Sequence, residues 1–221
     1  DEEISSGPSK LDLKKIINLI KNSPSVIIIS DYEKGFLTPN FLKQVIQSAN
    51  KKNIPVLIDP KGTNLEKYRG ATAITPNKKE AFILANITNK DDQLLNAALK
   101  KIIKEYNFNY IAMTQGDLGI KHITRNKVED YPSTISKEVF DVSGAGDTVI
   151  ATLAASIIAN TSLEDGFRLA NFSAGIVIRK IGTMPILKHE LLKELQYNTI
   201  TKHNIGKAIP KKERKKEGDE A

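Results

Sequence analysis

Short apolar runs that alternate with amphipathic segments constrain the fold of this 221-residue chain more than any other feature. The runs have the length of strands, and the segments between them repeat apolar residues every three or four positions, as helices do. Strands separated by helices form mostly parallel sheets that are covered on both faces. The run at 26–29 has no polar residue and is expected to be fully buried. We therefore predict an α/β fold, with strands at 26–29, 55–58, 71–75, 110–114, 118–124 and 127–131 and helices at 13–20, 41–49, 78–85, 91–105, 145–159, 163–181 and 188–196.

Polar residues stand at the ends of several predicted strands. Asp31 and Asp59 follow two apolar runs, and Asn77 and Thr114 come at the ends of the next two. Ligands of open parallel sheets bind beyond the carboxyl ends of the strands, so we expect these residues to gather at one site. Asp31 either contacts a substrate there or caps the turn that follows it.

A glycine-rich turn, Asp141-Val-Ser-Gly-Ala-Gly-Asp147, leads directly into an apolar helical pattern. Glycines leave room for an anion, and the first N–H groups of a helix point toward it. An acidic side chain at this place can act as a base for phosphoryl transfer to an alcohol. The alternative is a tight turn in which Asp147 only complements the helix dipole.

Composition narrows the class of protein. The chain has no cysteine, which excludes disulfides and thiolate metal sites. No apolar run reaches the roughly 18 residues of a membrane span and no signal-peptide pattern occurs, so we expect a cytoplasmic protein with no membrane partner. The net charge is +7, and residues 201–221 contribute +3 of it with seven Lys or Arg against four Asp or Glu. No aromatic residue stands among these lysines, which disfavours nucleic acid as a partner, and we predict a basic linker or disordered tail at 198–221.

Three motifs occur in order: Asn77-Lys78-Lys79-Glu80, Thr114-Gln-Gly-Asp-Leu-Gly119 and the glycine-rich turn at 141–147. They resemble the Asn-x-x-Glu motif, the nucleotide-contacting Thr-x-Gly-x-x-Gly motif and the anion-hole signature of the ribokinase-like (PfkB) carbohydrate kinases. The resemblance implies a three-layer α/β fold around a mostly parallel sheet. It also implies transfer of the γ-phosphate of ATP to a sugar hydroxyl.

A closer similarity, to the bacterial kinases of D-glycero-β-D-manno-heptose 7-phosphate, is carried by segments 30–35, 59–62, 68–71 and 144–150. This resemblance spans about residues 25–195. It implies phosphorylation of the anomeric hydroxyl of that sugar phosphate, a step toward ADP-heptose for the lipopolysaccharide core. Glu33 departs from these kinases, which usually have glycine at its place.

The front of the chain departs most from the family. Nothing before Leu11 resembles its first strand, with a Gly-Asp sugar-binding segment, or its β-sheet lid. We therefore expect residues 1–197 to be the nucleotide-binding, C-terminal part of a kinase domain without that strand and lid, which by itself binds ATP weakly and phosphorylates little sugar. Several heptose kinases continue into an adenylyltransferase domain with a His-x-Gly-His signature. The three histidines here form no such motif, so a fused domain of that kind is expected to be absent from this chain.

The resemblance also implies roles in catalysis. Asp147 would take the proton from the attacking hydroxyl, and Gly144, Ala145 and Gly146 would present N–H groups to the transferred phosphoryl group. Glu80 would act on Mg²⁺ through water, because magnesium keeps much of its hydration. Without the resemblance, Glu80 is a surface acid on a helix whose cap is Asn77.

A second set of residues is expected to bind ATP, with Asn171 beside the adenine. Each member has a structural alternative: a helix cap, a turn, a helix edge or a solvated lysine. The cofactors expected are ATP and Mg²⁺, and whether the enzyme also requires a monovalent cation is left open by the sequence. The set consists of Asn77, Lys78, Lys79, Glu80, Thr114, Gly116, Gly119, Asp141, Asn171 and Lys61.

Three alternatives to a heptose kinase stay open at this point. The first is another ribokinase-like kinase, acting on fructose phosphate or ribose. The second is an inactive fragment that binds nucleotide, and the third is a basic module that binds nucleic acid. The partners expected under the main hypothesis are a small sugar phosphate and ATP, with a homodimer in the full-length protein.

Overall fold

The computed structural model of the chain describes residues 7–89, 91–133, 144–180, 182 and 184–196. Contacts between residues divide the chain into a unit that ends at Pro185 and a second that begins at Ile186. The described part of the second unit contains a helix at 188–196, as predicted. No described helix has both the length and the apolar character needed to cross a membrane. The predicted division at residues 197 and 198 stays a prediction, because 197–221 lie outside the described residues.

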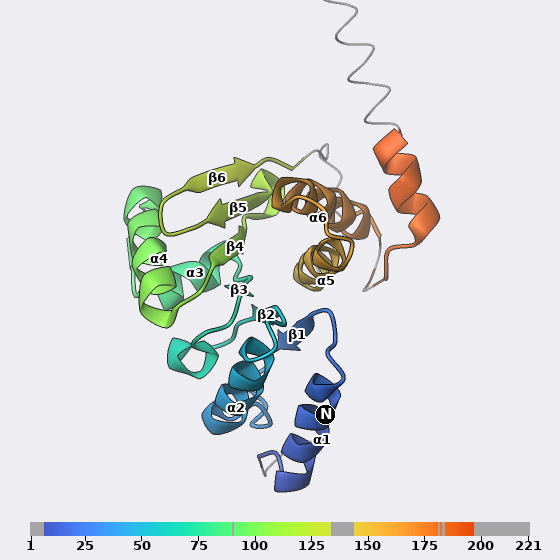
Figure 1. Cartoon of the computed structure of the whole chain (residues 1–221). Coiled ribbons are helices and arrows are strands. Elements are labelled where there is room, and N and C mark those ends of the chain that lie inside the picture. Colours follow the sequence, from blue (N-terminus) through green and yellow to red (C-terminus); the bar gives the residue numbers. More distant parts are fainter. Residues whose placement is uncertain (1–6, 90, 134–143, 181, 183, 197–221) are drawn as a thin grey trace, which may run out of the picture. The chain divides into compact units, whose positions relative to one another are not determined.

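The first unit alternates helices and strands in the predicted order (Figure 1). Its helices include two short 3₁₀ segments, η1 and η2. The elements are α1 (Lys10–Lys21), β1 (Ile27–Ser30), α2 (Pro39–Asn50), β2 (Val56–Asp59), η1 (Leu65–Tyr68), β3 (Ala73–Ile74), α3 (Lys78–Leu84), α4 (Asp92–Tyr106), β4 (Tyr110–Thr114), η2 (Gly116–Leu118), β5 (Ile120–Ile123), β6 (Val128–Tyr131), α5 (Ala145–Ile158) and α6 (Leu163–Val177).

The six strands form one mixed sheet in the order β1-β2-β3-β4-β5-β6. The first four are parallel, and β5 and β6 continue the sheet as an antiparallel extension. The register pairs Ser30 with Asp59, and Asn77, which follows β3, bridges to Thr114, the last residue of β4. Polar residues that follow different strands therefore lie along one edge of the sheet, as the sequence predicts.

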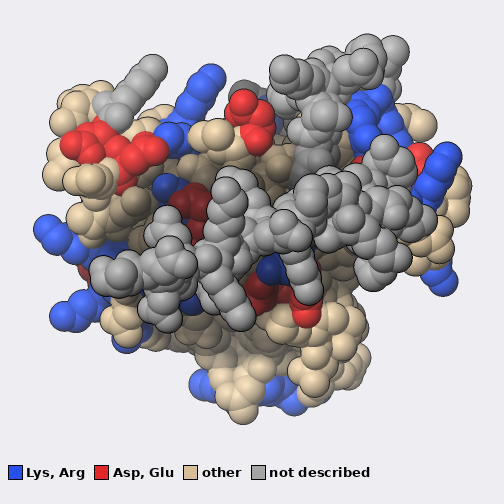
Figure 2. All heavy atoms as spheres, turned by 90° about the horizontal axis from the view of Figure 1, so that it is seen from above, with Lys and Arg blue, Asp and Glu red and all other residues tan. Residues whose placement is uncertain are grey.

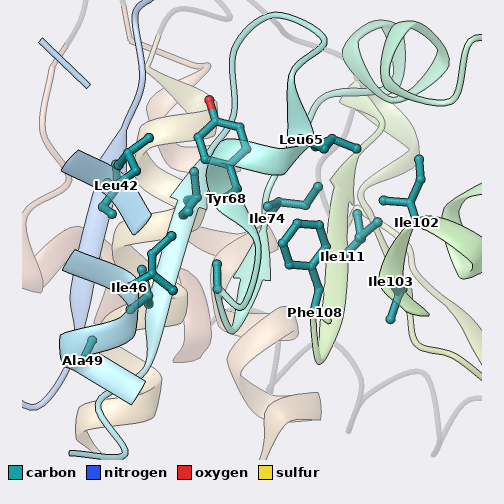
Figure 3. Packing of buried hydrophobic residues seen from close by; sticks show 14 of the residues in the cluster. Leu42, Ile46, Ala49, Leu65, Tyr68, Ile74, Ile102, Ile103, Phe108 and Ile111 are labelled. Atoms are coloured by element: carbon teal, nitrogen blue, oxygen red, sulfur yellow. The ribbon is translucent and has the colours of Figure 1, made fainter. Parts of the chain in front are cut away.

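Helices cover both faces of the sheet and create two cores. Alternate strand residues point to opposite faces, so Val56 and Ile58 join one cluster while Leu57 joins the other. Helices α1, α2 and α4 pack on the first face, and α5 and α6 pack on the second (Figure 1). Figure 3 shows the first core, in which Tyr68, Ile74 and Ile111 lie between side chains of α2 and α4.

Three sequence predictions need correction. Strand β1 is not fully buried: it is an edge strand among the described residues, and Ile28 is 43% exposed. Strand β3 has only two residues, because the Thr72 hydroxyl accepts a hydrogen bond from the Val56 N–H and the chain turns toward α3 after Thr75. Helix α6 ends at Val177 rather than at residue 181.

Candidate active site

Helix α5 begins at the glycine-rich turn. Gly144 is the N-cap residue with φ of +77°, in the left-handed region where glycine carries no Cβ penalty. No described side chain caps the helix, and a Cβ at Gly146 would meet nothing within 4 Å. The first N–H groups of a helix have no partner within it, so a helix start without a side-chain cap suits a phosphate group. Asp147 is exposed in the same turn.

A cavity of about 520 Å³ lies beside this turn. Its volume falls in the range of small-molecule sites, roughly 300–1,000 Å³. The apolar side chains of Val149 in α5 and of Ile178, the residue after α6, form part of its wall. The predicted ligand residues that line it are Asn77, Lys78, Lys79, Thr114, Gly116, Gly119, Ala145, Gly146 and Asn171.

Two of these lining residues are held in place by specific geometry. Gly119 has φ of +91°, and a Cβ there would lie 2.2 Å from the Tyr131 carbonyl oxygen, so only glycine fits. Asn171 is buried, and its amide Nδ2 donates to the same Tyr131 oxygen at 2.7 Å. Both residues thus join the cavity wall to the end of β6.

Glu80 has two partners in this structure. One carboxylate oxygen accepts the Asn77 N–H at 3.0 Å, while Asn77 Oδ1 accepts the Glu80 N–H at 3.0 Å, which completes a capping box. The other oxygen lies 3.1 Å from the Lys61 ammonium. The capping interpretation of Asn77 and Glu80 is therefore correct. The same carboxylate also faces Lys61.

Asp59, at the end of β2, is in the most strongly perturbed carboxylate environment of the edge. The pKa of Asp59 is raised to about 6, first by burial and then by the negative charges of Glu80 and Asp147, while Lys61 acts in the opposite direction. Three carboxylates thus share one region and interact electrostatically. Glu80, Asp147 and Lys61 are not among the residues that line the cavity. The residues that precede Glu80 and Asp147 in the chain, Lys79 and Gly146, do line it.

The residues present fit a magnesium nucleotide better than a bare metal. No group of three or more described His, Cys, Asp or Glu side chains is arranged to hold an ion by itself. Magnesium in kinases is usually held by one or two carboxylates, waters and substrate phosphates. The carboxylate region next to an N–H cradle for phosphate offers that combination.

The sequence did not assign a role to every residue of this region. Asp59 was recognised as a polar residue at a strand end, but its neighbours Glu80 and Asp147 come from distant segments. Val149 and Ile178 follow helical periodicity, which predicts core packing and does not indicate that they also line a cavity. The predicted ligand Asp141 lies outside the described residues.

Solved structures share this fold. The chain superposes on phosphofructokinase-2 of Escherichia coli in complex with potassium with a TM-score of 0.75 and 18% identity, over 87% of this chain and 64% of that one. Ribokinase of Arabidopsis thaliana, complexed with ribose and ATP, gives a TM-score of 0.70 and 21% identity, over 85% and 59% of the two chains. The architecture is therefore that of the ribokinase-like α/β kinases.

The chain belongs to the pfkB family of carbohydrate kinases, whose family model matches residues 20–190. The bifunctional protein HldE of Methylobacillus flagellatus is 44% identical over 177 residues, which cover 80% of this chain and 36% of HldE. HldE of Geobacter sulfurreducens is 40% identical over 173 residues, covering 78% of this chain and 35% of that protein. The chain thus spans about a third of the length of these relatives.

Proposed function

We propose that the chain is the nucleotide-binding part of an ATP-dependent kinase that phosphorylates the anomeric hydroxyl of D-glycero-β-D-manno-heptose 7-phosphate. The observation that carries this proposal is that residues of three motifs, distant from one another in the sequence, line one cavity. The chain is also 44% identical to an HldE protein. The substrates would be a small sugar phosphate and ATP with Mg²⁺ in the cytoplasm. A homodimer and a monovalent-cation requirement belong to the same proposal.

In this mechanism Asp147 takes the proton of the sugar hydroxyl while the oxygen of that hydroxyl attacks the γ-phosphorus. The new oxygen–phosphorus bond forms as the bond to the bridging oxygen of ADP breaks, and ADP leaves with that electron pair. The N–H groups of Gly144, Ala145 and Gly146 stabilise the charge on the transferred group. Mg²⁺ would neutralise phosphate charge, with Glu80 orienting its waters.

The remaining cavity residues would hold the nucleotide. The adenine would lie against the apolar wall of α5 and α6 near Asn171, and the phosphates near Lys78 and Lys79 at the start of α3. Thr114, Gly116 and Gly119, which also line the cavity, would supply backbone and hydroxyl groups to the nucleotide. Lys61, Asp141 and Asn77 would contact the phosphates or the water around them.

A different sugar is the main competing proposal, because the fold neighbours include a phosphofructokinase and a ribokinase. Nucleic acid is a weaker alternative. On the face shown in Figure 2, acidic and basic side chains are interspersed, whereas nucleic-acid sites concentrate positive charge.

The test has a binding step and a turnover step. Calorimetry on the purified chain measures the affinity for ATP with and without Mg²⁺, and a coupled assay measures ADP release with heptose 7-phosphate, fructose 6-phosphate and ribose. Both are repeated on the whole encoded protein if the coding sequence is longer. We expect Mg²⁺-dependent ATP binding by both proteins, weak for the chain by itself. Little turnover is expected of the chain by itself, and turnover selective for the heptose phosphate is expected of the whole protein.

The result that contradicts the heptose proposal is faster turnover of fructose 6-phosphate or ribose. Binding of ATP without turnover of any sugar by the whole protein would support an inactive nucleotide-binding fragment instead. Salt-sensitive binding of duplex DNA that survives deletion of residues 201–221 would support the nucleic-acid alternative.

A further inference from the structure

A buried polar cluster, made of Asp31, Lys67 and Tyr68, lies beneath the carboxyl ends of β1 and β2 and has no part in the mechanism above. All three side chains are buried, and the Lys67 ammonium lies 2.8 Å from Asp31 Oδ2. Tyr68 is fully buried, and Figure 3 shows its ring among apolar side chains with its oxygen pointing away from them.

The cluster holds the backbone of two loops. The Tyr68 hydroxyl donates to Asp31 Oδ2 at 2.6 Å and accepts the Lys61 N–H at 3.1 Å. Asp31 Oδ1 accepts the Glu33 N–H at 2.8 Å. The Asp31 side chain therefore caps its own loop, which is the second of the two roles predicted from the sequence.

Burial and hydrogen bonds shift the pKa values of Asp31 and Tyr68 in opposite directions. Burial alone would raise the pKa of Asp31, but hydrogen bonds from Lys67, Tyr68 and the Glu33 N–H hold it below its usual value. Burial and then the bond to Asp31 raise the pKa of Tyr68, so its hydroxyl keeps its proton. Because the Tyr68 hydroxyl donates this proton to Asp31, its oxygen is free to accept the Lys61 N–H.

Stability does not explain such a cluster well. A buried ion pair loses hydration on folding, and apolar side chains of similar shape are often as stable or more so. Geometry offers a better reason. Lys61 is the residue whose backbone N–H is held, and its own ammonium reaches Glu80 at 3.1 Å, in the region shared by Asp59 and Asp147.

We propose that Tyr68 is a positioning residue of the kinase site: its hydroxyl, oriented by Asp31, fixes the Lys61 backbone and so places the Lys61 ammonium between Glu80 and the nucleotide phosphates. This inference rests on the proposed function for its phosphate ligand. It concerns a residue that touches neither substrate. Its effect must therefore pass through Lys61, and that requirement distinguishes it from a contribution to folding alone.

The experiment is a double-mutant cycle on the affinity for ATP with Mg²⁺. Tyr68→Phe keeps the buried ring and removes only the hydroxyl, and we expect the affinity to fall roughly tenfold, as for other outer-shell positioning groups. In a Lys61→Met background, Tyr68→Phe should cause no further loss of affinity. Its effect on the melting temperature should be the same in both backgrounds.

Tyr110→Phe is the matched control, because Tyr110 is also buried but its hydroxyl has no described partner and the residue does not line the cavity. It should leave the affinity unchanged. Equal affinities for Tyr68→Phe and wild type overturn the proposal. So does a tenfold loss that persists in the Lys61→Met background.

A second measurement separates this inference from the proposed function. Amide hydrogen exchange at Lys61, followed without nucleotide, should become faster in Tyr68→Phe and not in Tyr110→Phe. If wild type binds no ATP, the proposed function fails, and unchanged exchange at Lys61 would overturn the positioning role independently.

Discussion

The cavity and the polar cluster of Asp31, Lys67 and Tyr68 lie along the same edge of the sheet, yet the sequence encodes them differently. The cavity is built largely from residues of three short motifs and from backbone N–H groups. The cluster joins side chains 36 and 37 residues apart, which no local pattern connects. Contacts made by backbone geometry can thus be read from local sequence, whereas buried side-chain networks require the fold.

The two regions also differ in how they hold charge. The cavity offers N–H groups and open space to an anion, and α5 begins there without a side-chain cap. The cluster pairs its charges internally and shows none to solvent. We expect substitutions near the cavity to change ligand binding or turnover, and substitutions in the buried network to act through the residues it holds.

The largest expected effect is that of Asp147→Asn on turnover. Loss of a positioned base lowers kcat by roughly 10²–10⁴ in an assay where wild type phosphorylates its sugar. The fold and the affinity for ATP should be unchanged, because Asp147 is exposed. Asp165→Asn is the control, since Asp165 also lies in the first turn of a helix, but that helix begins at Ser162 and not at the glycine-rich turn. Near-normal turnover of Asp147→Asn would remove this residue from the mechanism.

Gly119→Ala should have the next largest effect, on stability. The left-handed φ and a Cβ 2.2 Å from the Tyr131 oxygen force the backbone at the cavity wall to move, at a cost of about 2–5 kcal/mol. Denaturant unfolding measures this loss. Gly146→Ala is the contrasting variant: its Cβ meets nothing, so stability should hold while the affinity for ATP falls. Equal stabilities of the two variants would contradict the steric argument.

Sequence periodicity was sufficient to predict most of the helices and strands, because apolar patterns and helix caps depend on residues that are close in the sequence. Thr38 and Pro39 begin α2 as expected, and the polar strand ends meet at one edge. The exposure of Ile28 was not predictable, since a run of apolar residues looks the same in a central strand and at an edge.

The loop after β1 shows what local sequence leaves open. Glu33 has φ of +55°, in the left-handed region that favours glycine. Its carboxylate packs over Gly62, where a Cβ would lie 2.0 Å from Oε1. The sequence identified Glu33 as unusual, but only the fold shows that Gly62 makes room for it.

Glu80→Gln should have a smaller effect, which is confined to the concentration of Mg²⁺ that the enzyme needs. Glutamine can still complete the capping box with Asn77, so the fold is retained, while the charge that faces Lys61 and the metal's water is lost. We expect the Mg²⁺ concentration for half-maximal activity to rise roughly tenfold, with little change in the KM for sugar. Asp12→Asn, in the capping box of α1, is the control. A change restricted to the sugar KM would exclude the metal role.

The smallest expected effect is the pH dependence that Asp59 gives to stability. Its folded-state pKa of about 6 lies above the unfolded value of about 4, so ionised Asp59 destabilises the fold. This destabilisation is absent below about pH 4, develops as the pH rises to about 6, and persists above it. Asp59→Asn should therefore raise the melting temperature relative to wild type more at pH 8 than at pH 4.5, in buffer without divalent cations. Asp92→Asn, an exposed substitution in α4, corrects for general pH effects. A difference between wild type and Asp59→Asn that is the same at both pH values would show that burial and the charges of Glu80 and Asp147 do not raise the pKa of Asp59.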